Sequence, residues 1–130
     1  MGFMLNKMEV GLTPPIEYRA VTANEDVVLG EALALSAGKL TKCGATARPE
    51  YVAVGPKDDA GIAPVVRVQD YMEFETTLSA APAEGVTLAE GTKVTLAADG
   101  LQVTATTTSG VAVITWLGGT AAGDPVRVRF

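Results

Sequence analysis

Alternation of apolar and polar residues with a period of two is the feature that most constrains this chain. It is clear in residues 92–96 and recurs in residues 66–78, 101–105 and 126–130. Because successive side chains of a β-strand point to opposite faces of the sheet, this pattern is typical of strands with one buried face. No segment shows a sustained helical stripe. The sequence therefore predicts a mostly β protein, a small antiparallel β-sandwich or open barrel.

Turn residues separate these runs. Asp99-Gly100 lies between two alternating segments and predicts a tight hairpin, because both residue types tolerate the positive φ of primed turns. The alternating run from Val66 to Leu78 is long for one strand, so we expect a bend near Gln69-Asp70.

Two parts of the chain resemble each other at an offset of 61 residues. The identical pairs include Gly30 with Gly91, Leu35 with Leu96, Leu40 with Leu101, Val52 with Val113 and Pro64 with Pro125. Because turn positions and strand positions coincide together, the pattern indicates two duplicated strand-rich units. The alternative is two similar hairpins within one unrelated sheet.

These patterns divide the chain into three regions. Residues 1–23 are expected to form an extended N-terminal arm, because Pro14 and Pro15 exclude a regular helix there. Residues 24–84 form a first β unit and residues 85–130 a second, packed with the first as one compact domain.

The arm carries too many apolar residues for a free tail, so it must dock on its own sheet or on another chain. Trp116 is expected either in the core or at a subunit contact. The candidate contact residues are Phe3, Met4, Leu5, Met8, Val10, Leu12, Pro14, Pro15, Ile16 and Trp116.

Charge and hydropathy exclude several classes of function. The net charge is −5 and the ten basic residues are scattered, which argues against nucleic-acid binding. Apolar runs are far shorter than the roughly 20 residues of a membrane helix, and the N-terminus does not read as a signal peptide. We expect no membrane association.

The residue types and their spacing in the sequence give little support for a catalytic site. The chain has no histidine, so its single cysteine, Cys43, lacks a base. Asp58 and Asp59 do not have the spacing of an EF-hand loop. Glu73 and Glu75 share one strand face at roughly 7 Å, a spacing that glycosidases use, but with so few aromatic residues a solvated outer face is expected. We predict no enzyme, no metal and no cofactor.

The first unit resembles a known module. The segment from Ala32 to Leu40 is followed by Gly44, by Pro49 to Gly55, by Asp58-Asp59 and by the run from Val65 to Phe74. Over about residues 28–78 this order of strands and turns is similar to the head decoration, or capsid cement, proteins of tailed phages, in particular the phage lambda decoration module.

This resemblance implies a structural virion protein that binds the outer surface of the capsid and stabilises it. It implies the major capsid protein as partner, a homotrimer, and an arm, residues 1–21, that pairs with strands of the shell. The duplicated unit departs from the simplest family pattern and puts three-fold symmetry in doubt. The alternative is a bacterial surface or adhesin-like β-sandwich that binds a glycan or a protein, motivated by the Thr-rich segment 104–108.

Overall fold

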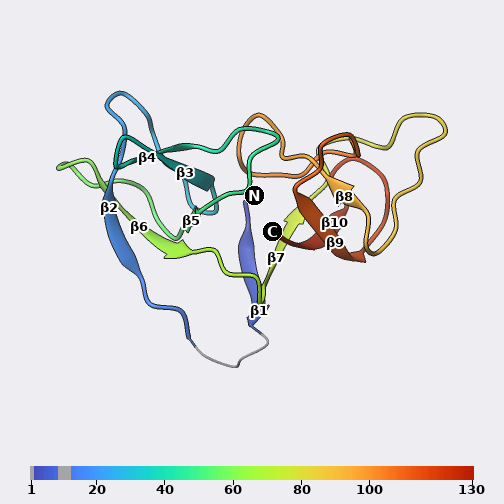
Figure 1. The fold of residues 1–130 in the computed structure, drawn as a ribbon, viewed down its shortest axis with the longest axis horizontal. Coiled ribbons are helices and arrows are strands. Elements are labelled where there is room, and N and C mark those ends of the chain that lie inside the picture. The colour runs from blue at the N-terminus through green and yellow to red at the C-terminus, as the bar shows by residue number, and fades with distance from the viewer. Residues whose placement is uncertain (1, 9–12) are drawn as a thin grey trace.

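The computed structural model describes residues 2–8 and 13–130, which form ten strands and no helix (Figure 1). The strands are β1 (Met4–Met8), β2 (Glu17–Ala20), β3 (Ala32–Ser36), β4 (Lys39–Lys42), β5 (Tyr51–Ala53), β6 (Ile62–Arg67), β7 (Met72–Thr77), β8 (Lys93–Val94), β9 (Ala112–Leu117) and β10 (Pro125–Arg129).

The strands form two five-stranded antiparallel sheets. We call β2-β6-β5-β3-β4 the first sheet and β1-β7-β10-β9-β8 the second sheet. In Figure 1 the first sheet lies on the left, the second on the right, and β1 runs between them. The arrangement is sandwich-like and not closed into a barrel, so the predicted fold class is confirmed.

Most of the core lies between the two sheets. Val52 and Val66 of the first sheet pack with Phe74, Ile114 and Val126 of the second, and all five are buried. A smaller cluster fills the other face of the first sheet, and it contains Val21, Val27, Leu33, Leu40, Tyr51, Ala53, Ala63 and Val65. Both faces of the first sheet are therefore buried over much of its area, which explains why its strands are richer in apolar residues than a simple alternation requires.

The expected bend in the long alternating run is present. Strand β6 ends at Arg67 and β7 begins at Met72. Residues 68–71 carry the chain from the first sheet to the second, where β7 pairs with β1 and β10. Apart from β1, which belongs to the second sheet, the strands thus change sheet at residues 68–71, whereas the predicted units met at residue 84.

The two sheets repeat each other. The order β6-β5-β3 in the first sheet corresponds to β10-β9-β8 in the second. The register also repeats at an offset of 61, because Ala32 lies opposite Val52 and Lys93 lies opposite Val113.

Four backbone hydrogen bonds recur at the same offset. In the first unit, backbone N–H groups donate to carbonyl groups in the pairs Gly30 to Ala53, Glu31 to Val28, Ala53 to Glu31 and Glu50 to Leu33. In the second unit, the matching pairs are Gly91 to Ile114, Thr92 to Ala89, Ile114 to Thr92 and Val111 to Val94. Two unrelated hairpins would not share this set of bonds, so the geometry supports the duplicated units.

The hairpin at Asp99-Gly100 is shorter than its sequence predicts. Gly100 has the expected positive φ of 72°. The two arms are joined by the bridge between Leu96 and Val103 and by a few backbone hydrogen bonds, such as that from the Ala97 N–H to the Gln102 carbonyl, but they do not form a continuous pair of strands. The reason is competition from the rest of the fold. The N–H of Leu96 bonds to Ala45 and the carbonyl of Gly100 accepts from Ala32, so these groups serve other segments instead of a ladder.

The N-terminal arm docks on the chain's own sheets. Strand β1 pairs with β7, and β2 pairs with β6. Phe3 is 2% exposed and its ring lies 5.3 Å from that of Phe130, in an edge-to-face contact that joins the two chain ends.

A close backbone crossing fixes this arm. The Phe3 N–H donates to the Gly30 carbonyl at 2.8 Å. A Cβ added to Gly30 would lie 2.7 Å from the Cα of Gly2, so only glycine allows the two segments to touch. Gly30 also has a φ of 85°, a conformation that other residues rarely adopt.

Replacing Gly30 by alanine tests this crossing, with Gly38→Ala as the matched control. Gly38 has a similar φ of 78°, but a Cβ there meets nothing within 4 Å. Both variants lose roughly 1–2 kcal/mol from the left-handed backbone, and we expect Gly30→Ala to lose about 1–3 kcal/mol more from the overlap. Denaturant unfolding measures both, and equal losses would mean that the arm does not cross at Gly30.

Candidate docking surface

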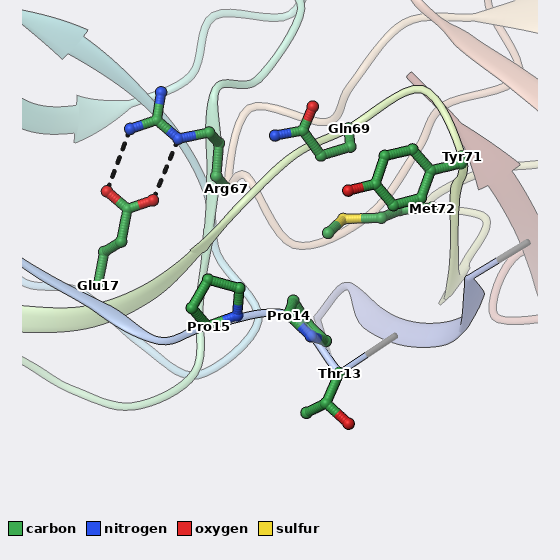
Figure 2. Close-up of a pocket in the computed structure, with 8 residues that line it drawn as sticks. All are labelled: Thr13, Pro14, Pro15, Glu17, Arg67, Gln69, Tyr71 and Met72. Carbon is green, nitrogen blue, oxygen red and sulfur yellow. Dashed lines mark hydrogen bonds and ion pairs between the residues drawn. The ribbon is translucent and has the colours of Figure 1, made fainter. Parts of the chain in front are cut away.

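A polar pocket lies where the arm passes from β1 towards β2 (Figure 2). Its volume is about 310 Å³ and it is lined by Thr13, Pro14, Pro15, Glu17, Arg67, Gln69, Tyr71 and Met72. Both carboxylate oxygens of Glu17 accept hydrogen bonds from Arg67, each at 3.1 Å, so the pocket's main charges neutralise each other.

This charge pair is part of a structural cluster. Hydrogen bonds from Arg67 lower the pKa of Glu17, with a further contribution from Arg19, although burial opposes them. The guanidinium carbons of Arg19 and Arg67 lie 4.9 Å and 5.2 Å from the ring centre of Tyr51. The cluster therefore closes one side of the smaller core with paired charges, and it leaves little free charge for a ligand.

An apolar groove of about 340 Å³ lies between the two sheets, beside β1. It is lined by Phe3, Met4, Leu5, Thr13, Pro14, Ile16, Leu29, Val52, Ala53, Val54, Val66 and Phe74. Only Thr13 among these has a polar side chain. The groove therefore offers almost no hydrogen-bonding groups to a small polar substrate, and it suits apolar side chains of another protein.

The exposed apolar residues of the molecule concentrate at this groove. Leu29 is 62% exposed, Met4 68%, Ile16 52% and Val54 37%. Exposed apolar residues scattered singly are normal, whereas a contiguous group marks an interaction site. These four residues come from four separate segments, so the fold itself brings them together.

The structure does not bring all of the predicted contact residues together. Met4, Leu5, Pro14 and Ile16 line the groove, and Pro15 lines the polar pocket. Phe3 is buried in the chain's own core. Met8 is the last residue of β1, while Val10 and Leu12 lie outside the described residues.

Trp116 lies away from the groove. It is 36% exposed on β9, and the guanidinium of Arg127 lies 4.6 Å from its ring centre. Arg127 also donates to Glu75 at 2.9 Å, so the tryptophan is covered by an ion pair of the second sheet. The groove and Trp116 therefore do not form one surface.

Two of the exposed apolar residues at the groove, Leu29 and Val54, were not predicted from the sequence. Leu29 ends the apolar run Val27-Val28-Leu29, and Val54 follows the buried strand β5. Neither is among the contact residues expected from the sequence. The available signal was that three consecutive apolar residues before Gly30 cannot all face one side of an extended chain.

The expected solvated face of Glu73 and Glu75 is wrong for Glu73, which is 5% exposed. The side-chain amide of Asn6 and the hydroxyl of Thr115 both donate to its carboxylate. Burial raises the pKa of Glu73, but these two hydrogen bonds and the nearby positive charges of Lys7 and Arg127 outweigh it, so the pKa is lowered overall. The buried carboxylate therefore remains ionised at neutral pH and ties β1 to β7 and β9.

The Cys43 thiol and the acidic side chains of the described residues offer no further reactive site. Burial raises the pKa of the Cys43 thiol to about 11, which keeps it protonated and unreactive at neutral pH. In the part of the chain that the structure describes, no three His, Cys, Asp or Glu side chains lie close enough together to hold a metal ion.

Among the described residues, no helix is present that could cross a membrane.

Comparison of the chain with protein-family models, with curated proteins and with solved structures finds no match.

The Glu73 network predicts an acid-sensitive contribution to stability. Because the folded pKa is below the ordinary value of about 4.3, this contribution is present at neutral pH and is lost as the pH falls towards the folded pKa. Glu73→Gln should lower the unfolding free energy at pH 7 by about 1–2 kcal/mol and flatten its decline in acid. Exposed Glu90→Gln is the control, and identical acid profiles for Glu73→Gln and the unmodified chain would contradict the network.

Proposed function

We propose that this chain is a structural virion protein that binds the outer surface of a tailed-phage capsid and stabilises it, with the major capsid protein as its partner. The observation that carries the proposal is the exposed apolar groove between the sheets, bordered by Met4, Ile16, Leu29 and Val54. The resemblance of residues 28–78 to capsid decoration modules gives the class of partner.

The groove fits a protein partner because its side chains offer burial and almost no polar recognition. Fully burying a large apolar side chain contributes roughly 1.5–3 kcal/mol. Four such residues on one rigid scaffold therefore provide a concentrated contact of the kind that dominates protein interfaces. Because the two sheets share one core, this contact surface is formed before the chain binds a shell.

A homotrimer is the assembly that the resemblance implies, and it forms part of the same proposal. Three copies around a three-fold axis would present three grooves to one shell position. Three weak contacts then act together, because each bound copy raises the effective concentration of the next.

A Thr-lined hollow supports a second candidate function, the binding of a glycan by a surface β-sandwich. The hollow is about 460 Å³ and contains Ser79 and residues 104–108. Its hydroxyl groups could bind sugar hydroxyls, but no aromatic residue lines it. A glycan array with Thr107→Val as the variant separates the two functions.

Leu29→Ser tests the groove directly. Leu29 is 62% exposed, so its loss should leave the fold intact. We expect its affinity for expanded tailed-phage shells that lack their decoration protein to fall roughly ten- to a hundredfold, measured by co-sedimentation, because a central apolar contact contributes about 2 kcal/mol.

Val28→Ser is the matched control for this experiment. Val28 is the adjacent residue and is 45% exposed, but it does not line the groove. Its affinity should stay within about twofold of the unmodified chain, since surface changes away from a contact have small effects. Equal losses in the two variants, or no shell binding by the unmodified chain, would contradict the proposal.

A further inference from the structure

The turn that carries Leu29 occurs in both units, as residues 28–31 and residues 89–92. In each turn, the N–H of the last residue donates to the carbonyl of the first residue at 3.1 Å. The third residue is a glycine with positive φ, 85° in Gly30 and 91° in Gly91, which is typical of a type II turn. The two turns share this backbone arrangement, so a comparison between them isolates the effect of their side chains.

The side chain of the last residue closes each turn a second time. The Thr92 hydroxyl accepts a hydrogen bond from the Ala89 N–H at 3.2 Å. In the first unit, the carboxylate oxygen Oε1 of Glu31 accepts from the Val28 N–H at 3.3 Å. A neutral hydroxyl is therefore sufficient for this closure, and the carboxylate of the first unit adds a negative charge that the closure does not require.

This carboxylate is buried and only partly satisfied. Glu31 is 3% exposed, and among the residues that the structure describes its oxygen Oε2 has no hydrogen-bond partner. The next turn packs against it, since a Cβ added to Gly100 would lie 3.2 Å from the Cγ of Glu31. Asp99 of that turn accepts from the N–H of Leu101. A buried charge without full hydrogen bonding is costly, so the ionised carboxylate opposes the closed turn.

The charged groups around Glu31 do not remove this cost. Burial has the largest effect and raises the pKa of Glu31, and the negative charges of Glu25 and Asp26 in the preceding loop raise it further. The hydrogen bond from Val28 and the positive charge of Lys42 on β4 lower the pKa, but they do not outweigh burial. The pKa of Glu31 is therefore above its ordinary value.

The sign of the pH effect follows from this direction. Because the folded pKa of Glu31 is above the ordinary value of about 4.3, the closed turn binds a proton more tightly than an open turn does. Closure is therefore favoured in acid, and this contribution is lost as the pH rises through the folded pKa. The equivalent turn is closed by the hydroxyl of Thr92 and should not respond in this way.

Leu29 connects this turn to the groove. It is the second residue of the turn, it is 62% exposed and it lines the groove. The turn also belongs to the rigid wall beside the groove, because the Gly30 N–H donates to the Ala53 carbonyl and the Gly30 carbonyl accepts from the Phe3 N–H. Opening of the turn would therefore remove Leu29 from its position at the groove.

We propose that the protonation of Glu31 regulates docking at the groove. The neutral carboxyl favours the closed turn that presents Leu29, and the ionised carboxylate favours its opening. Docking is therefore stronger in mild acid than at neutral pH, because the apparent affinity falls with the fraction of molecules that are competent to bind. The identity of the docking partner rests on the proposed function, whereas the response of the turn to pH rests on the contacts of Glu31.

Amide hydrogen exchange tests the turn without a shell. Protection factors of the Glu31 and Thr92 amides are measured by NMR on the full chain at about pH 4.5 and about pH 7, which lie on either side of the expected transition, and are corrected for the intrinsic effect of pH on exchange. We expect the Glu31 amide to be at least about twofold more protected in acid, with no change at Thr92. No change at Glu31, or equal changes at both amides, overturns the inference.

Two substitutions assign the response to the carboxylate. Glu31→Gln removes the charge and keeps an acceptor oxygen, and Glu31→Thr reproduces the hydroxyl closure of the second unit. We expect the protection of the amide of residue 31 to be independent of pH in each variant that folds. A response to pH that persists without the carboxylate overturns the role of Glu31.

Shell binding at the same two pH values tests the regulation of docking. The unmodified chain and Glu31→Gln are co-sedimented with expanded shells, and the ratio of their affinities cancels effects of pH on the shell itself. We expect the affinity of Glu31→Gln relative to the unmodified chain to be at least about twofold higher at neutral pH than in acid. A ratio that does not change with pH overturns the inference and leaves the proposed function standing. A turn that responds to pH in a chain that binds no shell contradicts the proposed function instead.

Discussion

The crossing of the N-terminal segment over residue 30 is the constraint on which the rest of the structure depends. Gly2 and Gly30 approach so closely that neither tolerates a Cβ, and the Phe3 N–H bonds to the Gly30 carbonyl. This contact leads Phe3 into the core between the sheets and directs β1 onto β7. The two duplicated halves therefore share one core, and the groove between them has a rigid wall.

The two units are similar, but β1 pairs with only one of them, and this difference connects the architecture to the proposed function. Strand β1 pairs with β7 of the second sheet only. The apolar groove between the sheets stays accessible, and Ile16 is exposed at it. A docking protein needs such a surface on a stable scaffold, so the asymmetry between two similar units can create a binding site without a change of fold.

The sequence predicted the sheet content and the offset of 61 because both depend on local alternation and on turn glycines such as Gly30 and Gly91. It did not predict which sheet receives β7, since its pairing with β10 joins residues 48 to 54 positions apart. Leu29 and Val54 were not identified as contact residues, because their exposure follows from how two separate segments meet. Glu73 read as solvated, because its partners Asn6 and Thr115 come from distant strands.

The central claim is that the groove between the sheets is the surface that meets a capsid. Cryo-electron microscopy of expanded shells incubated with the chain tests this claim most directly. The account predicts ordered density on the outer shell surface, with Met4, Leu29 and Val54 facing the capsid protein. Density in which these residues face solvent, or shells that remain bare at saturating concentration of the chain, would contradict it.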